Sequence, residues 1–302
     1  MIFKQHGGFM NTKENHTKNN NINTLLSFKK PVLQCLALWS LIGLSACAPS
    51  QHDTTHQKVS HSAHYKKIIG GTKVDASEDM SNTIVGLYDT KMKAICTGSI
   101  ISESVILTAA HCVDSGAESL KIIFSNDLAA KNIIWKSVQH TQVSDYWKTR
   151  QFLDQDTGDI ALLSFTGGLP PGYHPVKLLP HQNTLKIGDE VTLAGYGISN
   201  GVTGEGTFDL KKTTVQISET NFGKTEVLLD QRNGKGACHG DSGGPAYASV
   251  DGQLYLFGIT SRGNDDPNND CSHFAVYTNV LTYSNWLENT KSKIQIGHQA
   301  KK

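Results

Sequence analysis

The sequence contains no apolar run long enough to cross a bilayer as a helix, and neither sign of charge is in excess. The apolar stretch at residues 32–46 has 15 residues, against the ~20 that a membrane-spanning helix needs. The 302 residues carry 28 Lys and Arg against 27 Asp and Glu, so no basic field would steer the chain onto nucleic acid. We therefore expect no membrane-spanning helix and no nucleic-acid partner.

The sequence also lacks ten-residue helical patterns between its apolar runs, which argues against a parallel α/β sheet. From residue 68 onward, apolar runs of about four to nine residues alternate with Gly, Asn and Asp, which is typical of strands and turns. Examples of the predicted strands are residues 83–88, 100–108, 120–124, 160–165, 190–194, 213–217, 254–260 and 274–277. Near the end, a spacing of three and four predicts an amphipathic helix through Val280, Tyr283, Trp286, Leu287 and Thr290. The predicted body is all-β with a C-terminal helix.

The first 47 residues are predicted to be an export leader. Residues 1–30 are rich in Asn, Lys and Thr and cannot form a packed face, and translation could start at Met1 or at Met10. Lys29 and Lys30 then precede the apolar stretch, which ends in small residues. A positive flank, a short apolar run and small residues at its end are typical of a secretory signal.

The end of this leader permits two kinds of processing. Residues 44–47, Leu-Ser-Ala-Cys, resemble the bacterial lipobox, in which the Cys is lipidated and becomes the N-terminus. The alternative is ordinary cleavage after Ala48, because Ala46 and Ala48 satisfy the small-x-small rule. We favour lipidation of Cys47, with the following Ala resembling an outer-membrane address. The expected location is a bacterial membrane surface, or the periplasm or medium after release.

Residues 48–67 are predicted to be a polar linker and propeptide. They carry four histidines, His52, His56, His61 and His64, which could be a metal-binding tract. A solvated linker is favoured because no Cys or carboxylate cluster at ligand spacing accompanies them. The chain therefore divides into a leader (1–47), this linker (48–67), a folded body (68–290) and a polar C-terminal tail (291–302), and no metal site is predicted.

The cysteine pattern indicates disulfides. Two of the six Cys lie in the leader, and the other four allow three connectivities. An exported chain meets an oxidising compartment, where disulfides are expected. Pairing of near neighbours along the chain favours Cys96–Cys112 and Cys238–Cys271.

Three stretches of the body carry residues suited to nucleophilic catalysis. Ser242 lies in Gly-Asp-Ser-Gly-Gly-Pro, residues 240–245, where the glycines permit a tight turn and free the N–H groups of Gly240 and Ser242 for an oxyanion. His111 follows an apolar run and precedes a Cys. Asp159 stands at the mouth of the apolar run 160–163. Peptide hydrolysis by serine needs this set of a hydroxyl, a base and an acid that orients the base.

Each stretch alone has a structural explanation: a glycine turn, a structural histidine, a cap before a strand. Together, in the order His111, Asp159 and Ser242, they resemble the trypsin/chymotrypsin family over residues 68–290. The resemblance implies two antiparallel β-barrels with the active site between them. It also implies an endopeptidase that acts on protein or peptide substrates through an acyl-enzyme, needs no metal or organic cofactor, and is monomeric by default.

The resemblance extends to the start of the body. Ile-Ile-Gly-Gly at residues 68–71 is similar to the family's activated N-terminus, whose freed α-amino group pairs with the Asp before the nucleophile. Here that pair would be Ile68 and Asp241, formed after cleavage of the Lys67–Ile68 bond. The implied precursor is a zymogen, and a different, Lys/Arg-directed protease is expected to activate it. If Cys47 is lipidated, the same cleavage separates the body from its anchor.

The predicted specificity pocket lacks the family's basic-residue determinant. The position six residues before the nucleophile is Gly236, where trypsin-like members have Asp, and Gly263 and Ala275 are expected to form the wall. We therefore expect a preference for an apolar rather than a basic residue before the scissile bond. Arg262 stands where the family usually has Trp. It could pair with acidic residues of the next loop or crowd the cleft, although a solvated loop is favoured for Asp265, Asp266 and Asp270.

Two other classes of protein fit part of the pattern. Residues 240–244 also match the nucleophile elbow of α/β-hydrolases, but that fold requires βα units and an acid and a His after the serine. A binding protein that keeps a protease fold without turnover is the second alternative. All three catalytic residue types are present, so a serine endopeptidase is the favoured prediction.

Overall fold

The computed structural model describes residues 68–152, 155–180, 185–206 and 208–299. These residues all belong to one compact unit of the chain, residues 61–302. The predicted leader and linker, with Cys47 and Lys67, lie outside the described residues, as do residues 300–302. Within the described ranges, no helix is both long and apolar enough to span a membrane.

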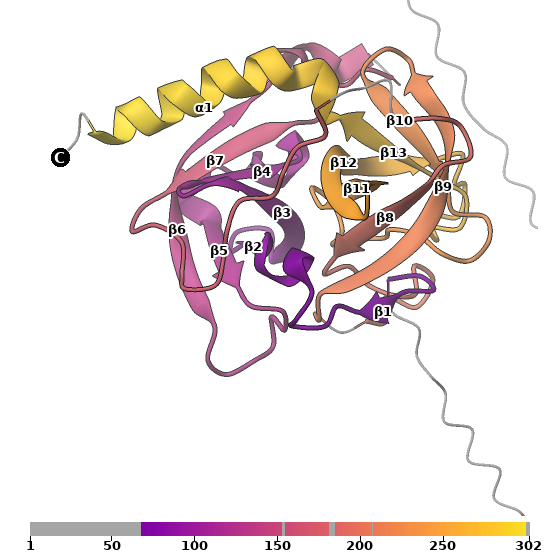
Figure 1. The fold of residues 1–302 in the computed structure, drawn as a ribbon, viewed down its shortest axis with the longest axis horizontal. Coiled ribbons are helices and arrows are strands. Elements are labelled where there is room, and N and C mark those ends of the chain that lie inside the picture. The colour runs from indigo at the N-terminus through magenta and orange to yellow at the C-terminus, as the bar shows by residue number, and fades with distance from the viewer. Residues whose placement is uncertain (1–67, 153–154, 181–184, 207, 300–302) are drawn as a thin grey trace, which may run out of the picture. The chain divides into compact units, whose positions relative to one another are not determined.

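Six antiparallel strands close the first barrel in the order β2-β3-β4-β7-β6-β5 (Figure 1). They are β2 (Ile84–Asp89), β3 (Ala94–Ser102), β4 (Val105–Thr108), β5 (Leu120–Phe124), β6 (Ile134–Val143) and β7 (Ala161–Phe165). Successive side chains of a strand point to opposite faces. On β4, Ile106 therefore fills this barrel, while Val105 and Leu107 join a cluster shared with the second barrel. Burial on both faces explains the continuous apolar run in the sequence.

Two strand predictions for this barrel need correction. The single strand predicted at residues 100–108 is the end of β3 followed by β4, with a turn at Glu103 and Ser104. Strand β6 was not predicted, because most of its residues are exposed or half-buried and so form no apolar run.

A second barrel is formed by β8 (Glu190–Gly195), β9 (Lys211–Phe222), β10 (Glu226–Asp230), β11 (Pro245–Val250), β12 (Gln253–Asn264) and β13 (Phe274–Asn279). The strand order is β9-β10-β13-β12-β11-β8, and pairing of β8 with β9 closes the ring. The short strand β1 (Thr72–Lys73) pairs with β9. Apolar side chains such as Val227, Leu229 and Phe257 fill the interior.

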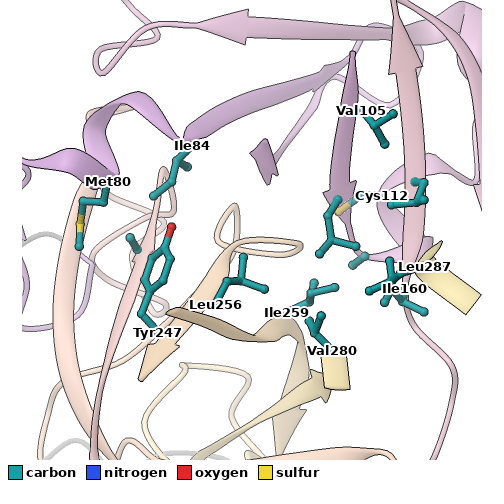
Figure 2. Close-up of a cluster of buried hydrophobic side chains, with 14 of the residues drawn as sticks. Met80, Ile84, Val105, Cys112, Ile160, Tyr247, Leu256, Ile259, Val280 and Leu287 are labelled. Carbon is teal, nitrogen blue, oxygen red and sulfur yellow. The ribbon is translucent and has the colours of Figure 1, made fainter. Parts of the chain in front are cut away.

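The two barrels share one buried cluster at their junction. Val105 and Ile160 of the first barrel belong to the same cluster as Tyr247, Leu256 and Ile259 of the second, and Figure 2 shows where these side chains lie in the cluster. Burying this apolar surface stabilises the docking of one barrel on the other.

The C-terminal helix connects the barrels a second time. After β13, a 3-10 turn (Val280–Tyr283) leads into α1 (Ser284–Gln299), and the side chain of Asn279 accepts the N–H of Leu281 at 3.1 Å as a cap. Leu287 joins the shared cluster, and α1 packs against β7 of the first barrel. The helix includes residues 291–299 of the predicted tail. Two closed antiparallel barrels with one C-terminal helix confirm the predicted fold class.

Two disulfides cross-link the segments that surround the barrel junction. Cys96 of β3 is bonded to Cys112, with the Cα atoms 6.2 Å apart. Cys238 is bonded to Cys271, with the Cα atoms 5.4 Å apart. These are the two pairs favoured from the sequence.

Removal of the Cys238–Cys271 bond should lower the free energy of unfolding by about 2–5 kcal/mol. The bond closes a segment with a sequence separation of 33 and limits the entropy of the unfolded chain. Urea unfolding of Cys238→Ala/Cys271→Ala under oxidising conditions measures the loss, and Cys96→Ala/Cys112→Ala is the matched variant. A loss below about 0.5 kcal/mol would contradict a stabilising role.

Candidate active site

His111 is held at the end of a buried strand. Strand β4 ends at Thr108, and the chain then makes one 3-10 turn (Ala110–Val113) that carries the imidazole. Cys112, beside it, is buried and bonded to Cys96 of β3. The backbone is therefore fixed from both sides, while the His111 side chain remains 32% exposed to the surface.

Asp159 lies just before β7 at the junction of the barrels and is only 2% exposed. Its Oδ2 atom lies 2.8 Å from Nδ1 of His111, and its Oδ1 atom accepts the backbone N–H of His111 at 3.0 Å. The second barrel supplies the other partners. The Ser261 hydroxyl donates to Oδ2 at 2.7 Å, and the Thr278 hydroxyl donates to the Asp159 carbonyl at 2.9 Å. Residues of both barrels thus orient this carboxylate.

The Asp159 carboxyl is held in its charged form. Burial is the largest effect and by itself would raise the pKa of Asp159. The charge of His111 and the hydrogen bonds from His111 and Ser261 together outweigh burial and lower the pKa below its ordinary value. A charged Asp159 favours the His111 tautomer with a proton on Nδ1, in which Nε2 is the basic ring nitrogen.

The loop that carries Ser242 is anchored on the first barrel. Thr97 of β3 donates its N–H to the Ser242 carbonyl at 2.8 Å and its hydroxyl to the Gly240 carbonyl at 2.9 Å. A Cβ atom on Gly243 would lie 2.0 Å from Oγ1 of Thr108, so only glycine fits there. The Sγ atom of Cys112 lies 3.6 Å from the Ser242 carbonyl oxygen. The structure therefore brings the Ser242 loop against the turn that carries the imidazole.

The N–H groups of this loop divide into two sets. Those of Asp241, Gly243 and Gly244 donate to backbone carbonyls at 2.8–3.0 Å. Those of Gly240 and Ser242 have no acceptor among the described residues. Gly240 adopts a φ of +98°, a conformation that glycine reaches without strain. Two N–H groups are thus available to an external acceptor where the sequence predicts an oxyanion hole.

Asp241 is a second buried carboxylate. Its oxygens accept the N–H of Gly197 at 2.8 Å and the N–H of Cys238 at 2.9 Å. A Cβ atom on Gly195 or Gly197 would lie 2.2 or 2.3 Å from these oxygens, so both glycines make room for the carboxylate. Burial raises the pKa of Asp241 to about 6, while the positive charge of Lys211 acts in the opposite direction.

The residues around the predicted activation site are well packed. Ile68 is fully buried, and its carbonyl accepts the N–H of Gly71 at 2.7 Å. Ile69 forms a bridge with Gly236, whose N–H donates to the Ile69 carbonyl at 3.0 Å. Lys211 is also fully buried, and its Nζ donates to the Gly197 carbonyl at 3.3 Å. The start of the body is therefore part of the same interior region as the Asp241 loop.

A cavity of about 230 Å³ opens beside Ser242. Gly263 and Ala275, two of the predicted pocket residues, line it. The third, Gly236, is not among the described residues that line the cavity. Gln231 lines it instead, because its side chain covers the α-carbon of Gly236.

Arg262 does not crowd the cleft as an unmatched charge. Its two terminal nitrogens each lie 2.8 Å from one carboxylate oxygen of Glu226, whose side chain is fully buried. Glu226 also accepts the N–H and the hydroxyl of Thr157 at 3.2 and 3.1 Å. The sequence suggested that Arg262 could pair with acidic residues of the next loop. In the structure it forms a bidentate pair with Glu226 instead.

Three residues of the site were missed by the sequence analysis. Glu226 precedes the apolar run 227–229 as Asp159 precedes its own strand, and this similarity could have identified it. Ser261 directly follows the strand predicted at residues 254–260, and nothing in the pattern pairs it with Asp159. Gln231 carries no local signal, because its role depends on the position of Gly236.

Clusters of His and Cys in the described region are not built for metal. There are two such groups in which the possible ligand atoms lie close together. One includes His111, and the other includes His239. In each, the two cysteines are bonded to one another as a disulfide, so neither group supplies thiolate ligands.

A two-barrel fold with an Asp–His pair and a glycine-flanked serine at the junction is typical of serine proteases. The trypsin family model matches residues 68–287. Tryptase of Mus musculus is 27% identical over 252 residues, covering 73% of this chain and 87% of that protein. Chymotrypsin-like elastase family member 1 of Canis lupus familiaris is 27% identical over 239 residues, 74% of this chain and 92% of that protein. Trypsin Blo t 3 of Blomia tropicalis is 28% identical over 276 residues, 85% and 98% respectively.

The chain therefore belongs to the trypsin family. It is a serine endopeptidase, and the α/β-hydrolase alternative is excluded by the two-barrel fold.

Ser261→Ala should lower the free energy of unfolding at pH 7 by about 1–3 kcal/mol, because the buried carboxylate of Asp159 loses a donor. The folded-state pKa of Asp159 is below its ordinary value, so its stabilising contribution is present above about pH 4 and is lost as pH falls through the folded pKa. The deficit of the variant should therefore shrink below about pH 4. Urea unfolding from pH 7 to pH 3 measures it. Ser249→Ala, at an exposed serine of β11, is the control. A deficit that is constant over this range would contradict the role of Ser261.

Proposed function

We propose that Ser242 is the nucleophile of this endopeptidase, that His111 is its general acid and base, and that Asp159 orients His111. The observation that carries the proposal is the double contact of the Asp159 carboxylate with Nδ1 and the backbone N–H of His111. This contact fixes the ring in the orientation that a general base needs.

In the proposed reaction, Oγ of Ser242 attacks the carbonyl carbon of the scissile bond while Nε2 of His111 takes the hydroxyl proton. The negative oxygen of the tetrahedral intermediate binds the N–H groups of Gly240 and Ser242. Collapse breaks the C–N bond, and His111 gives its proton to the leaving amine. Water, activated by His111, then attacks the acyl-enzyme, and the acid product leaves as Ser242 regains its proton. Apart from the substrate and the water, every group in this scheme belongs to the chain itself.

We further propose that the enzyme is made as a zymogen activated by cleavage of Lys67–Ile68. Asp241 supports this, because a buried carboxylate whose pKa is raised to about 6 gains from a new cation close by. The α-ammonium of Ile68 would be that cation. The fully buried position of Ile68 and its neighbour's bridge to Gly236 are consistent with an N-terminus that inserts beside this loop.

The activating protease is proposed to be a different enzyme with a preference for Lys or Arg. The bond to be cut follows Lys67, whereas the cavity beside Ser242 is lined by Ala275 and Gly263 and has the neutral Gln231 over Gly236. Asp266 also lines the cavity, but its carboxylate accepts the N–H groups of two residues of its own loop, at 3.2 and 2.8 Å. We therefore retain an apolar rather than a basic residue before the scissile bond as the proposed preference.

The proposed location follows from the leader and the disulfides. A signal ending at Cys47 would export the chain and, if the Cys is lipidated, anchor it to a bacterial membrane, with outer-membrane attachment favoured. Cross-links Cys96–Cys112 and Cys238–Cys271 support an oxidising compartment. Cleavage at Lys67–Ile68 would then release the catalytic body from the lipid.

Protein cut to begin at Ile68 should react with a fluorophosphonate probe, and uncut protein should react weakly. Ser242→Ala in the cut form should not label, and its kcat on peptides should fall by about 10⁴–10⁶-fold, because the nucleophile is lost. In-gel fluorescence and peptide hydrolysis measure both effects, and Ser249→Ala is the matched control. Equal labelling of cut and uncut protein would refute the zymogen. No labelling of folded, cut protein would refute the assigned roles and favour a binding protein.

The uncut chain should become less stable as pH rises from about 4 to about 6. The folded state holds a proton on Asp241 up to a pKa of about 6, whereas the unfolded chain releases it near its ordinary value. The folded state thus binds more protons in this window, and stability falls by about 2–3 kcal/mol across it.

This pH effect is measured as the difference in unfolding free energy between wild type and Asp241→Asn at pH 4, 5 and 6. Asp251→Asn, at an exposed position, is the control. Cleavage at Lys67–Ile68 should reduce the effect, since the new ammonium favours the charged carboxylate. Identical pH dependence in wild type and Asp241→Asn would contradict the assignment.

A further inference from the structure

The floor of the cavity beside Ser242 is formed by a residue that the sequence pattern did not identify. A Cβ atom on Gly236 would lie 2.2 Å from Cδ and 2.3 Å from Oε1 of Gln231. The amide group of Gln231 therefore occupies the space where a side chain at position 236 would extend. Consistent with this, Gln231 lines the cavity and Gly236 does not.

The Gln231 side chain is locked in place. Its Nε2 donates to the carbonyls of Ala237 and Cys271 at 3.1 and 3.2 Å, and its Oε1 accepts the Ala237 N–H at 2.6 Å. The residue is 2% exposed. Both amide hydrogens are used by backbone carbonyls, so the group is satisfied without help from a substrate. A satisfied, buried amide of this kind behaves as a rigid wall.

The backbone that carries Gln231 is fixed as well. The residue directly follows β10, its N–H donates to the His273 carbonyl at 2.9 Å, and its carbonyl accepts the N–H of Gly234 at 3.1 Å. His273 lies just before β13, so the paired strands β10 and β13 fix the position of the Gln231 amide in the cavity. The depth of the cavity is therefore built into the barrel.

We propose that Gln231 is a specificity-determining residue that shortens the substrate pocket and keeps its floor neutral. This rests on the proposed function, in which Ser242 attacks the bond next to the side chain held in this cavity. The substrate class is a peptide with an uncharged aliphatic side chain of intermediate length, such as Leu or Met, before the scissile bond. The side chains of Phe and Tyr are too long for a pocket whose floor is filled by the Gln231 amide. Lys and Arg meet a neutral amide at the floor, and the Asp266 carboxylate in the wall is already bonded to N–H groups of its own loop.

The first test compares kcat/KM for peptides that differ only in the residue before the scissile bond: Ala, Leu, Met, Phe, Tyr, Lys and Arg. Wild type should cleave after Leu and Met at least about 10-fold better than after Phe, Tyr, Lys or Arg, the scale of selectivity that pocket misfit supplies. In Gln231→Ala, the ratio of Phe to Leu cleavage should rise by about 10-fold or more, because the amide no longer fills the floor. Gln216→Ala, at an exposed glutamine of β9, is the matched control and should leave the profile unchanged.

A second test uses the position that Gln231 covers. Gly236→Asp alone should not create cleavage after Lys or Arg, because its side chain would overlap the Gln231 amide. Gly236→Asp combined with Gln231→Gly has room for the new carboxylate and should raise the ratio of Lys to Leu cleavage by about 10-fold or more over wild type. Gain of basic cleavage in the single variant would overturn the proposal.

Fluorophosphonate labelling of every variant separates this proposal from the assigned catalytic roles. If wild type labels and cleaves but Gln231→Ala keeps the wild-type profile, Gln231 has no role in specificity and the catalytic assignment stands. A wild-type preference for Phe, Tyr, Lys or Arg overturns the proposal directly, even if Gln231→Ala does not fold; a basic preference would assign specificity to Asp266. No labelling of folded, cut wild type overturns both.

Discussion

The hydrogen bonds to the buried carboxylate of Asp159 are the interaction on which the rest of the site depends. A charged group that is 2% exposed is tolerated only when its oxygens are satisfied. The donors to the carboxylate come from both barrels, His111 from the first and Ser261 from the second, and Thr278 of the second barrel also donates to the Asp159 backbone carbonyl. The relative position of the barrels is thus set by directional bonds as well as by the apolar cluster around Tyr247. A shift of one barrel against the other would leave a buried charge without its partners.

Two other buried carboxylates of this region also have polar or charged partners. Glu226 is buried beneath Arg262, and Asp241 is buried in a loop whose Gly197 bonds also to Lys211. Each buried acid in this region therefore has a cationic or imidazole group nearby. The Arg262–Glu226 pair is linked to the Asp159–His111 pair, since its guanidinium lies 3.3 Å from the Ser261 hydroxyl that donates to Asp159. Where an apolar wall is usual in the family, this protein has a polar network instead.

Much of this arrangement was predictable from the sequence because it is encoded locally. The segments around His111, Asp159 and Ser242 each combine an apolar strand or glycine turn with one reactive residue, and such patterns survive without knowledge of the fold. The residues that escaped prediction depend on contacts that only the folded chain creates. Gln231 matters only because Gly236 leaves a space, and Glu226 only because β10 and β12, the strand that carries Arg262, flank the same strand, β13. The apolar pattern that predicted other strands also failed to predict β6, because most residues of this strand are exposed or half-buried.

The hydrogen bond from Thr278 to the Asp159 backbone carbonyl has a consequence for the folding of the nascent chain. Thr278 lies on β13, the last strand of the second barrel, close to the end of the chain. A growing polypeptide that has emerged only as far as Ser242 carries all three reactive side chains, but Asp159 still lacks its support from β13. The hydrogen bonding around Asp159 is therefore complete only once β13 has folded into the second barrel. A chain that lacks β13 would leave the backbone carbonyl of Asp159 without this donor.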